Sequence, residues 1–394
     1  ASSMAGFADE VTLGSHGSRI YGNPRIVLRV EFPEGAPANL QSLYWRGRSY
    51  DRFDGIRWSR SRRIPPSQAP STWYERWGTD VLPQRIYGAP LEARILFALH
   101  PLLQIETESQ VQPIRDNAGD HLYWGSGPPG YTAYSISGRP SPEELRTAQG
   151  GYVPARDFYT QVPPLSRDVL GLADSLLASL PTDYDRAVAL ERWFRNAFTY
   201  TLDLPRTARE ATLEHFLLRR RAGHCEYFST AMAVLLRTQG VVAREVNGFL
   251  GGSWSPLGDY LAVTQNEAHA WVEVWFPGYG WVPFDPTPPG RGEAIGSSSW
   301  FWPGRFMVDA LQHRWNKWVL DYSFQTQFSI LEKGREWIRD ASAGSGKPES
   351  NPLPWLPAWV KWLGPAIVLA LLALIWSSRR DRGKPMETRM YLRL

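Results

Sequence analysis

The sequence predicts an α+β protein: a β-rich region, then helices followed by an antiparallel sheet, and a transmembrane helix near the end. Three observations support this prediction. Residues 1–150 contain alternating, β-branched segments separated by Pro and Gly clusters. After residue 150, capped helices precede a run of strands, an order typical of α+β folds. Residues 355–376 are apolar, nearly uncharged and long enough to cross a bilayer.

Composition narrows the class of protein. The 394 residues are 43% hydrophobic and 21% charged, which allows a substantial core and excludes a mainly disordered chain. A single cysteine, Cys225, excludes a disulfide scaffold. Residues 377–394 hold six basic and two acidic side chains, which leaves 37 of the 43 basic and 37 of the 39 acidic residues before them. Because that larger part is neutral, we expect no nucleic-acid partner.

Residues 1–150 are expected to form a β-rich, sandwich-like domain without a catalytic constellation. The first strand reads IVLRVEF, in which β-branched residues alternate with polar ones. The second and third are joined by the turn-like sequence DRFDG. The five predicted strands are Ile26–Phe32, Leu43–Tyr50, Gly55–Ser61, Glu92–Leu99 and Ala133–Ile136.

Residues 151–295 are expected to form the catalytic domain. Ser166 can cap a helix through residues 168–179, and Thr182 can cap a second helix with apolar residues at helical spacing. A short third helix is followed by a fourth that is apolar on most faces, hence buried, and that stops at Gly240. The last three helices are Asp183–Phe198, Leu213–Arg220 and Glu226–Thr238, and the predicted strands are Ala243–Leu250, Tyr260–Thr264, Ala268–Phe276 and Gly280–Phe284.

Three residues of this domain form a candidate catalytic triad. Cys225 lies at the first turn of the buried helix, where the helix dipole and free N–H groups favour a thiolate, and Gly223 allows close backbone approach before it. His269 lies on a strand and Asp285 follows the next one, and the turn FPGYG makes these strands a hairpin. A thiol, a base that takes its proton and a carboxylate that orients the base are the parts of a cysteine triad.

Each triad residue also has a structural explanation. Cys225 can be a small buried hydrophobe, His269 a satisfied sheet residue, and Asp285, which precedes a proline, a turn residue. Their joint placement favours the catalytic interpretation. Beside the thiol, we expect His224 to support the site indirectly or to lie at the surface, and Glu226 to complement the helix N-terminus. No paired His or Cys ligand motif is present, so we expect no metal and no cofactor.

Two motif-rich stretches carry a family resemblance. RRRAGHCEYFSTAMAVLLRTQGVVAREVNGF and EAHAWVEVWFPGYGWVPFDPTPP resemble the core of the bacterial transglutaminase-like superfamily over roughly residues 180–290. The Gly-x-Cys-x-x-Phe, Ala-His-Ala-Trp and Trp-x-x-Phe-Asp-x-Thr motifs contain Cys225, His269 and Asp285. The resemblance implies a papain-like α+β core and the membrane-bound TgpA-type branch, in which a multi-span region precedes a periplasmic domain, a further span and a cytoplasmic tail domain.

Three functions are considered. The resemblance alone places the first ahead of the second, and the intact triad argues against the third. The first is a protein-glutamine gamma-glutamyltransferase, in which Cys225 forms a thioester from a glutamine carboxamide and passes the acyl group to an amine. The second is a cysteine peptidase or cell-wall amidase that uses the same triad with water as the acceptor. The third is a non-catalytic envelope domain. The expected partner is a protein or peptide substrate, with cell-envelope components among the candidates.

The C-terminal sequence predicts the membrane topology. Trp355–Trp376 holds one charge, Lys361, which can snorkel to the interface, and tryptophans flank the apolar stretch. The basic tail at 377–394 predicts a cytoplasmic end, so residues 1–354 face the periplasm from the inner membrane. Residues 296–354 are expected to be a linker and helical extension. No signal peptide precedes the first domain, so we expect a fragment whose upstream spans are missing and whose tail is the start of a truncated region.

Overall fold

The computed structural model describes residues 7–288 except 15–24, 89–93, 108–110, 126–129, 149, 204–206, 208–209 and 257. All of them belong to one compact unit, Ala1–Asn316. The predicted extension at 296–354, transmembrane helix at 355–376 and tail at 377–394 lie outside these residues. Within the described ranges, no helix combines the length and apolarity that a membrane crossing requires.

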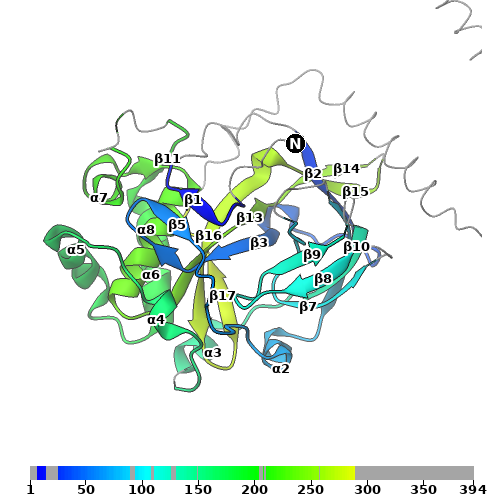
Figure 1. Cartoon of the computed structure of the whole chain (residues 1–394), viewed down its shortest axis with the longest axis horizontal. Helices are drawn as coiled ribbons and strands as arrows, with labels where there is room; N and C mark the ends of the chain where they lie inside the picture. Colours follow the sequence, from blue (N-terminus) through cyan, green and yellow to red (C-terminus); the bar gives the residue numbers. More distant parts are fainter. Residues whose placement is uncertain are drawn as a thin grey trace, which may run out of the picture. The chain divides into compact units, whose positions relative to one another are not determined.

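A four-stranded antiparallel sheet in the order β17-β16-β13-β3 carries the candidate site (Figure 1). All four strands were predicted from sequence. The hairpin around FPGYG is confirmed, since Phe276 pairs with Gly280 and Val272 with Phe284. The strands are β3 (Tyr44–Tyr50), β13 (Ala243–Leu250), β16 (Ala268–Phe276) and β17 (Gly280–Phe284).

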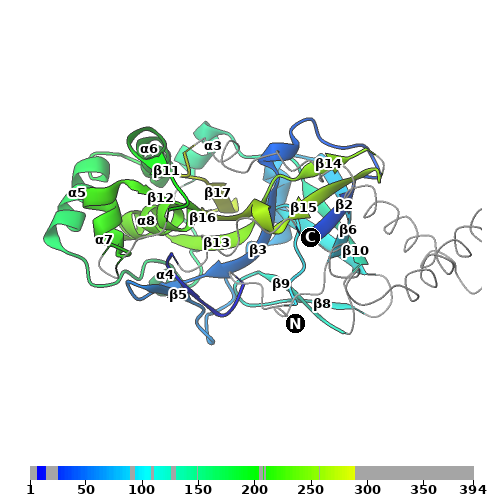
Figure 2. The ribbon, with the colours of Figure 1, turned by 90° about the horizontal axis from the view of Figure 1, so that it is seen from above.

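Three helices pack beside this sheet (Figures 1 and 2). α8 contacts β16 and β13, while α5 and α6 pack against α8. The predicted caps are confirmed: Ser166 Oγ accepts the N–H of Val169 at 3.4 Å, and Thr182 Oγ1 accepts that of Asp185 at 3.1 Å. The helices are α5 (Arg167–Leu177), α6 (Asp183–Ala197) and α8 (Cys225–Thr238), and the short third helix is α7 (Leu213–His215) with a π-helical turn over Phe216–Arg220.

A six-stranded antiparallel sheet in the order β14-β15-β2-β6-β10-β7 forms the β-rich part (Figure 2). Two of its strands, β14 and β15, come from the later part of the chain, whereas β3 from the first part belongs to the other sheet. Strands therefore cross the boundary expected at residue 150 in both directions. The bounds are β2 (Ile26–Glu31), β6 (Val81–Gly88), β7 (Leu102–Thr107), β10 (Gly130–Ile136), β14 (Ser253–Ser255) and β15 (Tyr260–Thr264).

The remaining helices and strands of the described chain are short. They are strands β1 (Glu10–Thr12), β4 (Arg52–Phe53), β5 (Arg57–Ser59), β8 (Gln112–Arg115), β9 (His121–Trp124), β11 (Thr199–Tyr200) and β12 (Ala222–Gly223), helices α2 (Ser71–Tyr74), α3 (Pro142–Thr147) and α4 (Arg156–Tyr159), and 3₁₀ turns Leu40–Ser42, Glu75–Trp77 and Gln265–Glu267. The prediction of a strand over Glu92–Leu99 is wrong. In its described residues, Ile95 and Ala98 form only isolated bridges, to Leu122 and Arg46, because this apolar segment passes from one sheet to another.

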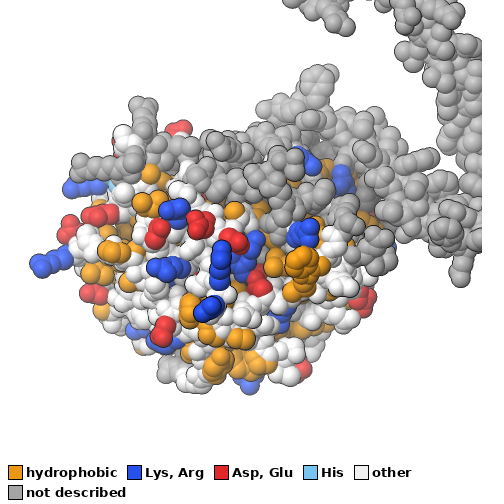
Figure 3. Space-filling model, viewed as in Figure 1, with side chains coloured by type: hydrophobic (Ala, Val, Ile, Leu, Met, Phe, Trp, Pro, Cys, Tyr) orange, Lys and Arg blue, Asp and Glu red, His pale blue; other side chains and the backbone are white. Residues whose placement is uncertain are grey.

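Two hydrophobic clusters lie beneath the sheets. One surrounds α8, where Phe228 and Leu235 are buried with Val272 of β16. The other joins the six-stranded sheet to Trp45 of β3. On the face shown in Figure 3, acidic and basic side chains are interspersed, which fits the balanced charge of this part of the chain.

Candidate active site

His269 and Asp285 are hydrogen-bonded, as the predicted hairpin implies. His269 is the second residue of β16, and Asp285 directly follows β17. His269 Nε2 lies 2.7 Å from Asp285 Oδ2, and both side chains are buried. When one ring nitrogen faces a carboxylate, the opposite nitrogen, here Nδ1, is the one that exchanges a proton with a nucleophile. The structure thus brings two of the three predicted residues together.

Three donors hold the Asp285 carboxylate. Besides His269, the Tyr44 hydroxyl donates to Oδ2 at 2.8 Å, and the Thr287 backbone N–H donates to Oδ1 at 3.0 Å. Burial raises the pKa of Asp285, but the charge and hydrogen bond of His269 and the backbone hydrogen bond of Thr287 outweigh it and hold the pKa below its usual range. Asp285 is therefore ionised and can stabilise an imidazolium.

Cys225 is the first residue of α8, which packs against the strand of His269. At this position the free N–H groups and the dipole of the helix favour a thiolate. The side chain is only 5% exposed. Gly223, two residues before Cys225, is tightly packed. A Cβ at this position would lie 3.1 Å from the Phe216 ring and 3.2 Å from Tyr227. The close approach expected of this glycine is confirmed.

His224 is buried beside the thiol, at 1% exposure, so the surface position considered for it is wrong. Its Nδ1 lies 3.9 Å from Glu226 Oε2, which also accepts the Gly14 backbone N–H at 3.2 Å. Burial lowers the pKa of His224, but a hydrogen bond with Cys225 and the charge of Glu226 raise it overall. The raised pKa widens the pH range over which His224 carries a positive charge, and such a charge next to Cys225 favours the thiolate.

Tyr44 is a site residue that sequence reasoning missed, because its only signal was membership in a strand far from the motifs. Its ring centroid lies 5.2 Å from that of Trp271 and 6.2 Å from that of His269. Gly248 of β13 lies between β3 and β16, and a Cβ there would come within 2.6 Å of the Trp271 ring. Glycine at this position therefore lets the Trp271 ring lie across β13.

Glu245 is a second missed residue. It is 2% exposed on β13, and its Oε1 accepts the Ser229 hydroxyl of α8 at 2.9 Å. Its Oε2 has no hydrogen-bond partner among the residues that the structure describes. Burial raises the pKa of Glu245 well above its usual value, and the charges of Glu226 and Cys225 add to the effect. Glu245 therefore keeps its proton to a higher pH than an exposed carboxyl does.

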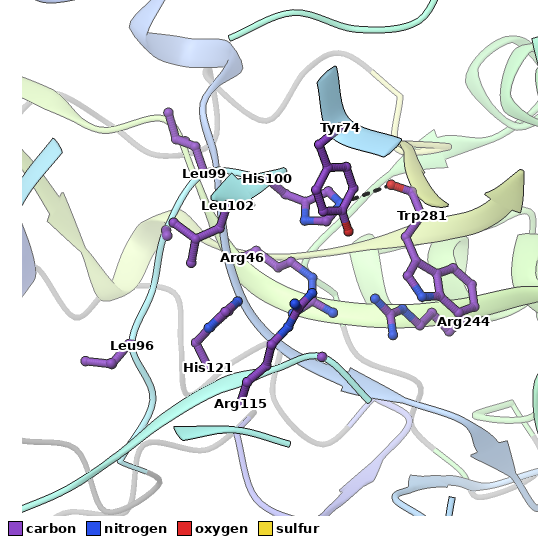
Figure 4. A pocket seen from close by; sticks show the side chains of 12 residues that line it. Arg46, Tyr74, Leu96, Leu99, His100, Leu102, Arg115, His121, Arg244 and Trp281 are labelled. Atoms are coloured by element: carbon purple, nitrogen blue, oxygen red, sulfur yellow. Dashed lines mark hydrogen bonds between the residues drawn. The ribbon is translucent and has the colours of Figure 1, made fainter. Parts of the chain in front are cut away.

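A buried ion network ties together three strands of the site-bearing sheet. Arg46 Nε of β3 donates to Glu273 Oε1 of β16 at 2.9 Å, and Arg244 Nε of β13 donates to Oε2 at 2.8 Å. The two arginines line a cavity of about 20 Å³ together with His100 and Trp281 (Figure 4). In the described part of the chain, no three His, Cys, Asp or Glu side chains are arranged to hold a metal ion.

Two relatives match large parts of the chain. It is 29% identical over 340 residues to the protein-glutamine gamma-glutamyltransferase of Pseudomonas aeruginosa, an alignment that covers 78% of this chain and 48% of that protein. It is 35% identical over 191 residues to the uncharacterized protein YebA of Bacillus subtilis, covering 45% of this chain and 25% of YebA. The chain thus spans half or less of these relatives.

Solved structures agree with this similarity. The crystal structure of the periplasmic domain of TgpA from Pseudomonas aeruginosa superposes with a TM-score of 0.59 at 29% identity, covering 71% of this chain and 93% of that domain. The same domain bound to ethylmercury gives a TM-score of 0.60 at 28% identity, covering 73% and 98%. Residues 171–286 match the transglutaminase-like superfamily, and residues 1–142 match the TgpA N-terminal domain. Residues 171–286 are therefore a domain of the transglutaminase-like superfamily, preceded by a domain of the TgpA N-terminal type.

Proposed function

We propose that this chain is a thiol-dependent acyltransferase of the transglutaminase type, with Cys225, His269 and Asp285 as its catalytic residues. The observation that carries the proposal is the 2.7 Å contact between His269 Nε2 and Asp285 Oδ2, on a strand against which the Cys225 helix packs. The similarity to a protein named protein-glutamine gamma-glutamyltransferase supports the reaction type.

In the proposed reaction, the Cys225 thiolate attacks the carbonyl carbon of a glutamine γ-carboxamide. Backbone N–H groups at the start of α8 stabilise the resulting oxyanion. The His269 imidazolium gives its proton to the leaving nitrogen, ammonia departs, and a Cys225 thioester remains. A primary amine then attacks the thioester carbonyl, His269 takes the amine proton, and the C–S bond breaks to release the amide and the thiolate. Asp285 orients His269 and stabilises its charged form throughout.

We further propose that the site faces the periplasm, with residues 355–376 as an inner-membrane anchor. The similarity to a periplasmic domain supports the compartment. The proposed substrates are proteins or peptides, including those of the cell envelope, and no cofactor takes part in the reaction.

The test is to incubate the 394-residue chain with a glutamine-containing peptide and a labelled primary amine, and to follow amine incorporation and ammonia release together. A transferase incorporates amine in proportion to the ammonia released, and Cys225→Ala abolishes both. Ammonia release without incorporation would identify the hydrolase alternative. If the wild-type chain and Cys225→Ala gave the same background with every donor, the domain would be non-catalytic.

A further inference from the structure

We infer that Tyr44 is a positioning residue of the proposed triad, so that the N-terminal region completes the active site of the transglutaminase-like domain. The inference rests on the proposed function. Tyr44 precedes residues 171–286 by more than a hundred positions, yet its hydroxyl donates to Asp285 Oδ2 at 2.8 Å. The same oxygen faces His269 Nε2 at 2.7 Å.

The hydrogen bonds around Asp285 explain what Tyr44 does. Thr287 N–H holds Oδ1, and Tyr44 holds Oδ2 from a direction other than that of His269. Donors on both oxygens oppose rotation of the carboxylate, so Oδ2 stays directed at the imidazole. If the Tyr44 hydroxyl is removed, His269 is the side-chain donor that remains on Asp285 Oδ2 among the described residues.

The position of Tyr44 is itself fixed by buried contacts of β3. Tyr44 pairs with Leu250 of β13. Two residues along the strand, Arg46 donates to Glu273 of β16 at 2.9 Å and to Asp120 at 2.8 Å. These charge-assisted bonds hold β3 in one register within the site-bearing sheet, so the hydroxyl is preorganised.

Charged side chains near Tyr44 and Asp285 come from several elements. From α6, Glu191 Oε1 accepts the Asp285 backbone N–H at 3.0 Å, and Arg195 lies 3.5 Å from Glu191. Burial and the neighbouring Asp285 raise the pKa of Tyr44 far above its ordinary value. Tyr44 therefore remains a hydrogen-bond donor at any pH at which the triad works.

The experiment is a double-mutant cycle on the whole 394-residue chain. The rate at which iodoacetamide alkylates Cys225, the single thiol, is measured between about pH 4 and pH 9 for wild type, Tyr44→Phe, Asp285→Asn and the double variant. Tyr50→Phe is the matched control, because it removes another hydroxyl from β3, one that donates to the Ala8 carbonyl at 2.9 Å.

We expect Tyr44→Phe to slow alkylation about tenfold at neutral pH, the scale of one hydrogen bond to a charged group. The acidic midpoint of the profile should rise, because a less well-oriented carboxylate supports the imidazolium, and hence the thiolate, less. In the Asp285→Asn background the same change should have no further effect, since residues that act through one another are not additive. Tyr50→Phe should leave the profile unchanged.

Equal effects of Tyr44→Phe in both backgrounds, no effect at all, or a midpoint that moves to lower pH would overturn the positioning role. A midpoint at lower pH would mean that the Tyr44 hydroxyl only weakens the stabilisation that the Asp285 charge gives the imidazolium. Failure of the proposed function is a different result, namely a wild-type Cys225 that reacts like an ordinary thiol and is indifferent to Asp285→Asn.

Discussion

Arg46 Nε lies 2.9 Å from Glu273 Oε1, and this buried pair joins the N-terminal strand β3 to β16, the strand of His269. Arg244 shares the same carboxylate through a 2.8 Å bond. We predict that Glu273→Gln lowers the free energy of unfolding by about 3–5 kcal/mol. The change removes the buried carboxylate that Arg46 and Arg244 share, and Arg46 then keeps Asp120 as its carboxylate partner. Urea unfolding at neutral pH measures this change, and a loss below about 1 kcal/mol would contradict it.

The same carboxylate predicts a pH dependence. Burial raises the pKa of Glu273, but the charges of Arg46 and Arg244 outweigh it and lower the pKa to about 2. A carboxyl whose pKa is depressed by folding contributes stability above its unfolded pKa and loses it as pH falls through the folded pKa. The wild type should lose this contribution between about pH 4.5 and pH 2. In Glu273→Gln the free energy of unfolding should fall less over the same pH range.

Glu245 should have the opposite pH dependence. Its pKa is raised by burial, so the folded protein keeps its proton to a higher pH than the unfolded chain. This residue therefore costs stability as pH rises above its unfolded pKa of about 4.3. Glu245→Gln should have a higher Tm than wild type at alkaline pH, with a smaller difference near pH 5, in thermal unfolding followed across that range. A difference in Tm that does not grow with pH would show that Glu245 is ionised in the fold.

Local signals predicted most of the elements around the site. The caps at Ser166 and Thr182 depend on residues near each other in the chain, and the hairpin turn was enough to place His269 beside Asp285. The predicted resemblance over roughly residues 180–290 agrees with the matched range 171–286.

What sequence reasoning missed depends on pairing between distant segments. Tyr44 reaches Asp285 across 241 positions, and only the pairing of β3 with β13 brings it there. The placement of β14 and β15 in the six-stranded sheet is equally non-local, because it depends on the pairing of β15 with β2 from the first part of the chain. Glu245 looked like an ordinary strand residue, since its burial follows from α8 packing over it.

The topology prediction concerns residues outside the described structure. The apolar stretch at 355–376 followed by a basic tail predicts a cytoplasmic position for residues 377–394. A reporter fused after Leu394 should be active when it requires the cytoplasm and inactive when it requires export. A matched fusion after residue 350 should give the reverse pattern. Export-dependent activity after Leu394 would reverse the orientation and place the triad on the cytoplasmic side.

The proposed roles predict an order among the triad variants. Cys225→Ala and His269→Ala should remove turnover, and Asp285→Asn should be roughly a hundredfold milder than His269→Ala, because it disturbs orientation and imidazolium stabilisation without removing the base. Amine incorporation into a glutamine peptide measures each loss. Asp168→Asn is the control, because it removes the charge of an exposed carboxylate on α5, and it should keep wild-type activity.

The fold should survive these changes, which separates lost chemistry from lost structure. Cys225 is the first residue of α8, and alanine is the strongest helix former, so Cys225→Ala should shift Tm by only a few degrees. Alkylation of the single thiol should abolish wild-type turnover, and an organomercurial that binds thiols should compete with the alkylating reagent. A fully active Cys225→Ala protein, or activity that survives stoichiometric alkylation, would make Cys225 a buried hydrophobe of the helix start and would remove His269 and Asp285 from the reaction proposed for them.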